Sequence, residues 1–244
     1  MHPPADCDLC PLARAGRTQT VPGDGPVPCD VMLVAEAPGQ WEDRTGIPMS
    51  SPTGAGAVLE DLLERNGLPR RRVYVTNLVK CRPPRNRDPE RVEIDTCTAH
   101  YLKFEIERVK PKVIIACGRF AVEYFLPGEK LSKVHGTPRR RGGIVVLPVY
   151  HPAAALHNPK MRAALERDYT AIPDALALAL EGEHTVTVLD GVAPPAPLIA
   201  LDTEARIRDS QLVCFSTSVD GVTAWVGIPT QLSGRRPQRS AISR

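Results

Sequence analysis

The sequence has few aromatic residues, no long apolar run and little net charge. Two Trp, five Tyr and four Phe in 244 residues are too few for a surface that stacks many nucleic-acid bases. No apolar run approaches the ~18 residues that a membrane span needs, and the first residues lack the basic and apolar regions of a secretory signal. A formal net charge of +3 is too small to indicate a nucleic-acid partner without local basic clusters.

The composition does supply enough apolar material for a folded domain. Hydrophobic residues make up 42% of the chain and charged residues 24%, which excludes wholesale disorder. The length suits one ordinary domain with a shorter additional segment. Because neither a membrane span nor a secretory signal is present, we expect a cytoplasmic protein in a bacterial or phage-infected cell.

Seven cysteines in a chain without a secretory signal argue against a disulfide framework. Cys7 and Cys10 form a C-x2-C pair, whose thiolates can bind one metal centre. Spacing alone favours zinc and an iron–sulfur cluster about equally, with a metal-free turn as the third alternative. Cys117 lies in an apolar run and is predicted to be a core residue, and Cys29 and Cys214 are interpreted as structural.

Short apolar runs alternate with helical patterns along the first 180 residues. The predicted strands are residues 31–34, 73–76, 113–116 and 144–149, and the predicted helices are residues 57–67, 89–109, 119–125 and 159–179. In the second helix, the apolar stripe includes Val92. Strands that are apolar throughout and alternate with helices are typical of a parallel sheet covered on both faces. We therefore predict a three-layer α/β/α fold with a central, mostly parallel four-stranded sheet.

Three polar segments follow the ends of predicted strands. They are residues 36–39, residues 77–81 and the pair His151-Pro152. The carboxyl ends of parallel strands lie along one edge of a sheet, and binding sites form there. We therefore expect the three segments to converge.

The same segments belong to motifs that resemble the family 4 uracil-DNA glycosylases. The motifs are AEAPGQWED at 35–43 with GIPMSSPTG at 46–54, NLVKCRPPRNRDP at 77–89, and HPAAALHNP at 151–159. Their order and spacing match that family over roughly residues 5–180. The resemblance implies hydrolysis of the bond between uracil and deoxyribose in DNA, after the nucleotide is flipped out of the duplex.

The resemblance also assigns catalytic and base-reading roles. Glu36 would position or polarise the attacking water, and His151 would donate a hydrogen bond to uracil O2 as negative charge develops there. Asn77 would read the uracil edge with its carboxamide. The purely structural alternatives are that His151 caps a loop at a strand end and that Asn77 forms an Asx-turn.

Four further residues are implied to bind the substrate. Backbone N–H groups near Ala37 and Gly39 would cradle the base, and Glu42 would crowd uracil C5 and so exclude the methyl group of thymine. A solvated loop carboxylate is the alternative for Glu42. Met49 stands where the family usually has an aromatic residue that stacks on uracil, and Ala35 stands where it usually has Gly. Both departures weaken the match.

The family binds a 4Fe–4S cluster, and the resemblance assigns its ligands as Cys7, Cys10, Cys81 and Cys97. The implied DNA contacts come from Arg82, Arg85 and Arg140, with Leu156 as a wedge in the minor groove. Uracil-containing DNA is the expected partner of a chain that is expected to be monomeric, and replication or repair proteins are further candidate partners.

The C-terminal region differs in composition from the rest. We assign residues 1–181 to the glycosylase-like domain and residues 182–197 to a Pro-rich linker. Residues 198–244 contain predicted strands at 211–215 and 223–228 and a basic tail. Within them, LDTE at 201–204 resembles the first motif of 3′–5′ proofreading exonucleases, whose later acidic motifs are absent. This leaves two alternatives to a glycosylase: a catalytically weak, DNA-binding module of a phage-type polymerase, and a zinc-binding structural protein.

Overall fold

A computed structural model of the chain describes residues 6–156 and 158–180 and, further along, the backbone of residues 207–208, 211–212, 214–217 and 224–227. The chain divides into two units between residues 182 and 183. In the second unit, β6 (Ile207–Arg208) pairs with β7 (Gln211–Leu212), and β8 (Cys214–Thr217) pairs with β9 (Ala224–Gly227), both antiparallel. The predicted linker, the LDTE motif and the basic tail lie outside the described residues.

The first unit is built on a five-stranded sheet with the order β2-β1-β3-β5-β4. Its strands are β1 (Val31–Ala35), β2 (Tyr74–Asn77), β3 (Val113–Cys117), β4 (Arg139–Arg141) and β5 (Ile144–Val149). The pairs of β1 with β2, β1 with β3 and β3 with β5 are parallel, which confirms the four predicted strands.

The prediction of a four-stranded sheet is wrong, because the sheet has a fifth strand. This is the edge strand β4, which runs antiparallel to β5. Three consecutive arginines have no apolar alternation, so their sequence indicates only an exposed charged surface. The strand forms because Gly142 and Gly143, with φ of 54° and 86°, supply the two-residue turn that a hairpin needs.

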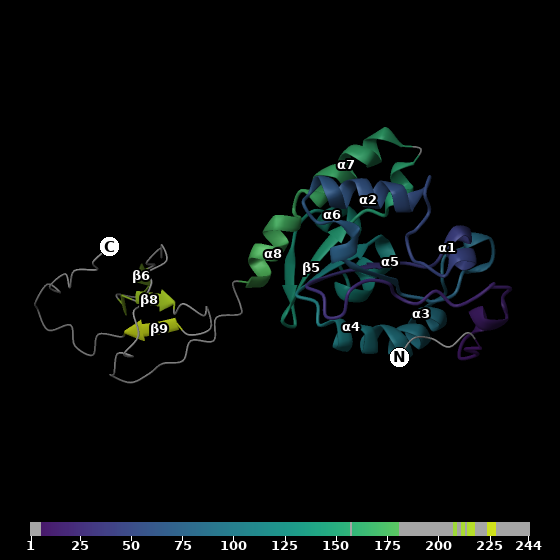
Figure 1. Ribbon diagram of the computed structural model, residues 1–244, viewed down its shortest axis with the longest axis horizontal. Helices are drawn as coiled ribbons and strands as arrows, with labels where there is room; N and C mark the ends of the chain where they lie inside the picture. Colours follow the sequence, from purple (N-terminus) through teal and green to yellow (C-terminus); the bar gives the residue numbers. More distant parts are fainter. Residues whose placement is uncertain are drawn as a thin grey trace, which may run out of the picture. The chain divides into compact units, whose positions relative to one another are not determined.

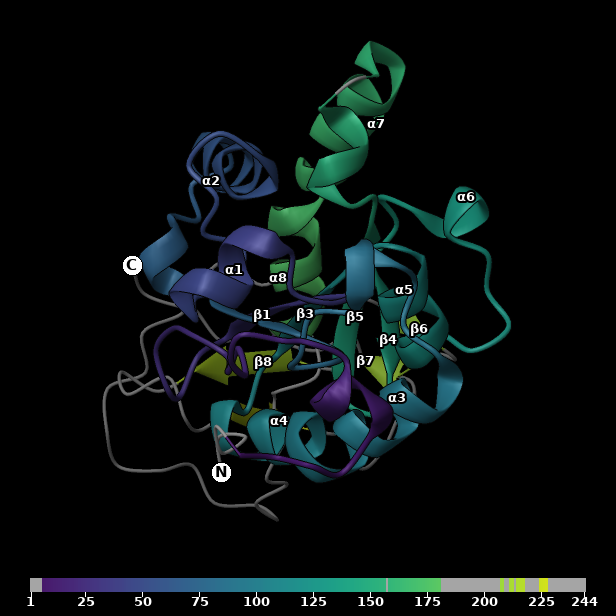
Figure 2. The ribbon, with the colours of Figure 1, turned by 90° about the vertical axis from the view of Figure 1, so that its right-hand side faces the viewer.

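Helices cover both faces of the sheet, as the three-layer prediction requires (Figures 1 and 2). One face packs against α2 (Ala55–Arg65), α7 (Pro159–Tyr169) and α8 (Ile172–Leu180). The other packs against α3 (Arg91–Cys97), α4 (Lys103–Val109), α5 (Arg119–Phe125) and α6 (Leu131–Val134). Neighbouring strand residues serve opposite faces: Leu33 belongs to the first core, and Met32 and Val34 belong to the second. The fold is therefore the predicted α/β sandwich.

Two predicted helices are interrupted. The helix expected at 159–179 is divided into α7 and α8 because Pro173 has no N–H and its ring excludes the helical carbonyl four residues earlier. The helix expected at 89–109 contains a π-helical turn, Thr98–Leu102, between α3 and α4. The predicted apolar stripe is wrong at its start, because Val92 is 52% exposed and α3 buries Glu93, Ile94 and Cys97 instead. Further along the stripe, Leu102 and Val109 are buried as predicted.

Short segments complete the unit. They are α1 (Gln40–Thr45) and the 3-10 turns Pro11–Arg14, Arg70–Arg72, Pro84–Asn86 and Pro152–Ala155. Within residues 6–156 and 158–180, no helix has the length and apolar character needed to cross a bilayer. Cys117 is completely buried in the sheet, which confirms its prediction as a core residue.

Candidate active site

A cavity of about 290 Å³ lies at the carboxyl edge of the sheet, where residues following β1 and β5 meet. Six residues predicted from the motifs line it: Glu36, Ala37, Gly39, Glu42, Met49 and His151. The remaining lining residues are Pro38, Ala55, Pro83, Asn86, Arg87 and Ala153. The three motifs therefore do converge, and they do so around a space that a small ring can enter.

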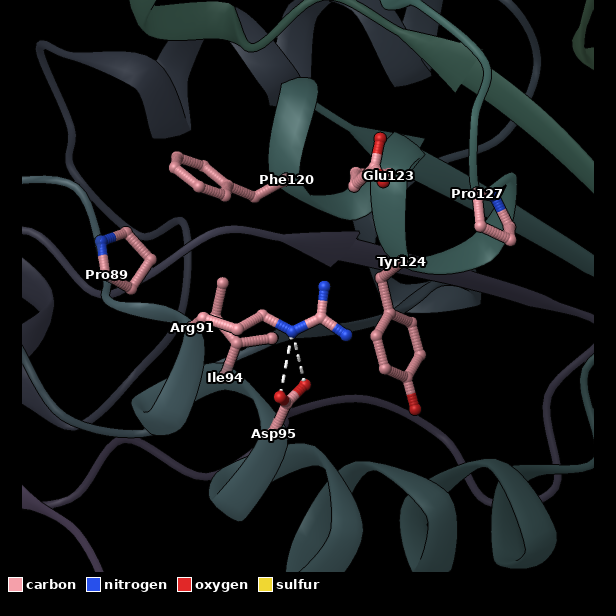
Figure 3. Close-up of a pocket in the computed structure, with 8 residues that line it drawn as sticks. All are labelled: Pro89, Arg91, Ile94, Asp95, Phe120, Glu123, Tyr124 and Pro127. Atoms are coloured by element: carbon pink, nitrogen blue, oxygen red, sulfur yellow. Dashed lines mark hydrogen bonds and ion pairs between the residues drawn. The ribbon is translucent and has the colours of Figure 1, made fainter.

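A larger cavity of about 390 Å³ lies between α3 and α5 and contains none of the predicted site residues. Figure 3 shows its lining, in which the guanidinium of Arg91 points to the carboxylate of Asp95. The two groups are 2.8 Å apart, so they satisfy each other. The smaller cavity is the candidate site because two of its ionisable groups have shifted pKa values. Burial raises the pKa of Glu36 toward neutrality and lowers the pKa of His151.

His151 follows β5 directly and is held as a neutral hydrogen-bond donor. Its Nδ1 accepts the backbone N–H of Ala153 at 3.2 Å, so the expected capping role is present. Burial lowers the pKa of His151 to about 4, so the ring is neutral at pH 7. A neutral imidazole whose Nδ1 is an acceptor carries its proton on Nε2. Capping thus leaves Nε2–H available to a ligand.

Glu36 follows β1 and lines the same cavity. The pKa of Glu36 is raised to about 7, mainly by burial and also by the negative charge of Asp88, while the positive charge of Arg119 opposes both. The carboxyl group therefore changes its protonation state near neutral pH. A group of this kind can accept a proton or a hydrogen bond from water during a reaction.

Glu42 connects the two loops that frame the cavity. Its carboxylate accepts the backbone N–H groups of Gly39 and of Met49, the latter at 2.8 Å. The residue is only 8% exposed, so the solvated-loop alternative is wrong. Met49 has a φ of 51°, in the left-handed region, and the hydrogen bond from its N–H helps to hold this conformation. The effect of Glu42 on thymine stays a prediction.

Asn77 ends β2, where it lies opposite Ala35 in the register of the sheet. The residue is completely buried, and neither its amide nitrogen nor its amide oxygen has a partner in the described part of the protein. An Asx-turn would use the amide oxygen, so that alternative is wrong. Asn77 is not among the residues that line the cavity. Buried amides without hydrogen-bond partners are rare in folded proteins. This one is paired in the sheet with Ala35, the residue that directly precedes Glu36.

The four predicted cysteine ligands belong to one electrostatic neighbourhood. The pKa of Cys97 is raised to about 12, mainly by burial; Lys80 opposes the shift through its charge and its backbone N–H, and the neighbouring Cys81 and Cys10 add to it. The pKa of Cys81 is raised mainly by burial and also by Cys10 and Cys7. The structure thus brings the N-terminal C-x2-C pair to the loop after β2 and to the end of α3, as the resemblance implies.

Protein donors already point at these sulfur atoms. The guanidinium of Arg17 lies 2.9 Å from Cys81 Sγ, the hydroxyl of Tyr101 lies 3.1 Å from Cys7 Sγ, and the N–H of Lys80 lies 3.3 Å from Cys97 Sγ. Such donors are typical around iron–sulfur clusters, where they stabilise thiolate charge. Within residues 6–156 and 158–180, no three His, Cys, Asp or Glu side chains are grouped to hold a metal ion. Thiolates are ligands for zinc as well as for iron–sulfur clusters, so the shared neighbourhood of the four cysteines does not separate these two alternatives.

The predicted DNA contacts do not all lie together. Arg85 is exposed beside the cavity, in a turn where it and Asn86 have φ of 54° and 55°. Arg82 binds the side-chain oxygen of Asn86 at 2.7 Å. Leu156, after the turn that His151 begins, is 39% exposed.

Arg140 lies elsewhere. It is paired with Val145 near the amino end of β5, opposite to the end that carries His151, and its guanidinium donates to the carbonyl of Leu178. The structure therefore does not bring Arg140 to the other DNA contacts. Local pattern could not indicate this position, because three consecutive arginines do not predict the edge strand.

Several cavity residues were not predicted, notably Ala55, Pro83, Asn86 and Arg87. Three of them belong to the second motif, so its continuation past Cys81 could have indicated them. Arg87 also differs from its neighbours: its guanidinium makes two hydrogen bonds, of 2.9 and 2.6 Å, to the completely buried carboxylate of Glu93. It is an anchor for the loop rather than a free cation.

The chain is similar to known proteins over most of the first unit. The model of the uracil DNA glycosylase superfamily matches residues 22–173. The type-4 uracil-DNA glycosylase of Sulfurisphaera tokodaii is 43% identical over 176 residues, which are 68% of this chain and 78% of the relative. The type-4 enzyme of Saccharolobus solfataricus is 42% identical over 181 residues, 70% of this chain and 82% of the relative. A DNA polymerase of Bacillus phage SP01 is 27% identical over 85% of this chain, but over only 20% of the polymerase.

Proposed function

Because this chain belongs to the uracil DNA glycosylase superfamily and is a uracil-DNA glycosylase of the type-4 class, we propose that Glu36, Asn77 and His151 carry its reaction. The enzyme hydrolyses the N-glycosidic bond of uracil in DNA and leaves an abasic site. The observation that carries the proposal is the state of His151, a neutral ring at the cavity whose Nε2–H has been left free by the capping bond at Nδ1.

The proposed step is dissociation of the bond between C1′ and N1. Positive charge develops on the sugar, and negative charge develops on uracil, mainly at O2. A hydrogen bond from His151 Nε2–H to O2 stabilises that charge without transferring a proton, because a neutral donor is already in place. Glu36, which lines the same cavity, orients the water that attacks C1′.

Base selection is proposed for Asn77. Its carboxamide presents an acceptor and a donor side by side, which match N3–H and O4 of uracil, whereas cytosine presents the inverse pattern. The buried amide without a protein partner supports this role, since a ligand edge would satisfy both atoms. The backbone N–H of Ala37 is proposed to face the base, whereas the N–H of Gly39 is bound to Glu42, so Gly39, Glu42 and Met49 shape the wall of the cavity.

A 4Fe–4S cluster held by Cys7, Cys10, Cys81 and Cys97 is the proposed cofactor. The shared electrostatic neighbourhood of the four cysteines and the three donors to their sulfur atoms support it. The cluster would supply structural cross-linking: it would join the N-terminal segment to the loop after β2 and to α3. We propose that the enzyme acts as a monomer on DNA, with Arg82, Arg85 and Leu156 in contact with the strand.

The direct test is incubation with an oligonucleotide that contains one uracil, followed by alkaline cleavage at abasic sites. The parent protein should yield the cleaved product, and Asn77→Ala and His151→Ala should yield much less. An intact oligonucleotide after incubation with the parent would contradict the proposal.

The pH dependence of the reaction should follow Glu36. Because its pKa is raised to about 7, Glu36 is mostly protonated below that pH and ionised above it. If the carboxylate orients water, the single-turnover rate should rise as pH increases through about 7 and then level off, while His151 stays neutral throughout. A Glu36→Gln variant should be slower and should lose this dependence. The assignment would be wrong if that variant kept the same pH profile as the parent.

Arg85 and Arg91 offer a matched test of DNA contact. Both are exposed, but Arg85 belongs to the motif that contributes to the cavity, whereas Arg91 does not line it. Replacement of Arg85 by Ala should weaken binding to DNA of any sequence and lower the slope of log K against log salt by about one. Exposed Arg91, paired with Asp95, is the control, and its replacement by Ala should leave the slope unchanged. Equal slopes for the parent and Arg85→Ala would remove Arg85 from the DNA interface.

A further inference from the structure

A buried ion pair contacts Asn77, and no role described above uses it. Lys80 and Glu105 have side chains that are 1% and 3% exposed, and Lys80 Nζ lies 2.6 Å from Glu105 Oε2. The ammonium group has three donors. They bind Glu105, the hydroxyl of Thr76 and, at 2.7 Å, the backbone carbonyl of Asn77.

The carboxylate of Glu105 is equally well satisfied. Its Oε2 also accepts the hydroxyl of Thr76 at 3.0 Å, and its Oε1 accepts the N–H of Gly23 at 3.2 Å. A buried ion pair is tolerated only when its remaining donors and acceptors are bonded in this way. Such a network has one arrangement, so the groups that it contacts are held rigidly.

The π-helical turn brings Glu105 to this position. Cys97 and Glu105 are eight residues apart, and in a regular α-helix at about 100° per residue their side chains would point about 80° apart. The π-helical turn at Thr98–Leu102 accommodates one extra residue, so Cys97 and Glu105 are oriented as if they were seven residues apart. Their side chains then point only about 20° apart. Both side chains then contact Lys80, Cys97 through the backbone N–H and Glu105 through Nζ.

We propose that Lys80 and Glu105 are positioning residues for Asn77. No described protein group forms a hydrogen bond with the Asn77 carboxamide, so the hydrogen bonds that hold this residue are those of its backbone. Lys80 makes one of them, at the Asn77 carbonyl, and Glu105 holds Lys80. The inference rests on the proposed base-reading role of Asn77, and it adds that the charge pair holds that amide ready before uracil arrives.

The test is a cycle of variants with uracil release as the readout. Lys80→Met combined with Glu105→Gln removes both charges with little change of volume. We expect kcat to fall by about tenfold or more with little change in KM, because misplacing a reacting or recognising group slows chemistry while the DNA contacts remain. In an Asn77→Ala background the same double change should have no further effect. Arg91→Met with Asp95→Gln, an exposed ion pair, is the control and should leave kcat unchanged.

The inference would be overturned if the double change lowered kcat by the same factor in the Asn77→Ala background as in the parent, because the pair would then act independently of Asn77. Loss of absorbance near 400 nm in the double variant, which is about the region where iron–sulfur clusters absorb, would also overturn it and place the effect at the cysteines. If the double variant does not fold, Thr76→Val, which removes only the shared hydroxyl, replaces it in the same cycle. Activity of the parent tests the glycosylase function by itself. An Asn77→Ala variant as active as the parent would overturn the base-reading role of Asn77 and, with it, the positioning role of Lys80 and Glu105, while the glycosylase function would stand.

Discussion

Replacing His151 with alanine is expected to lower the rate of uracil release by ~10²–10³-fold, the usual effect of removing one preorganised donor from a developing negative charge. The expectation depends on the state of the ring: Nδ1 is occupied by the N–H of Ala153, and burial lowers the pKa to about 4. Nε2–H is then the donor at all pH values at which the protein is assayed. Single-turnover kinetics with a uracil-containing oligonucleotide measures the loss.

His100 provides the control for this variant. It is exposed, and its Nδ1 contacts the carbonyl of Thr96 within the same helix. His100→Ala should keep the rate of the parent, and both variants should keep its circular dichroism spectrum. A rate for His151→Ala within about threefold of the parent would show that no strong hydrogen bond to the leaving base comes from this residue.

Replacing Cys97 with serine is expected to abolish the absorbance near 400 nm and to lower the iron bound per chain by about fourfold or more. Serine cannot replace a buried thiolate that completes a set of four ligands. Since the cluster would join residues 6–28 to the rest of the domain, this segment should also become sensitive to proteases. Iron analysis, absorbance and limited proteolysis together give a result that does not depend on activity.

Cys29 is the matched control, because it is also buried but lies outside the cysteine group. Its Sγ contacts the carbonyl oxygens of Val31 and Arg72 at 3.1 and 3.2 Å, bonds that a serine hydroxyl can also form. Cys29→Ser should therefore keep the iron content of the parent. Full iron in Cys97→Ser, or zinc in place of iron in the parent, would contradict the proposed cluster.

The local pattern was enough to predict the sheet and the cavity. Each parallel strand is a continuous apolar run, and such runs remain recognisable without knowledge of their neighbours. The motifs follow those runs directly, so the parallel order alone places Glu36 and His151 at one edge. What local pattern could not reveal was β4, whose three arginines carry no apolar alternation, and the break before α8.

Charged residues were the main source of error. Arg82, Arg85, Arg87 and Arg140 look alike in the sequence, yet Arg87 binds a buried Glu93 and Arg140 lies near the other end of the sheet. Glu105 occupies a position that periodicity assigns to an exposed helix surface, and the π-helical turn rotates it into the core. Which charge finds a partner depends on the relative rotation of distant elements.

The amino-acid sequence by itself determined the four parallel strands, the three motifs and six of the twelve residues that line the cavity, because these depend on short-range alternation and on position after a strand. Only the tertiary structure decided the protonated nitrogen of His151, the absence of a described partner for the Asn77 amide, and the buried pair that contacts its carbonyl. Hydrogen bonds are directional and end within about 3 Å, so they exist only once residues far apart in the chain have been packed against one another.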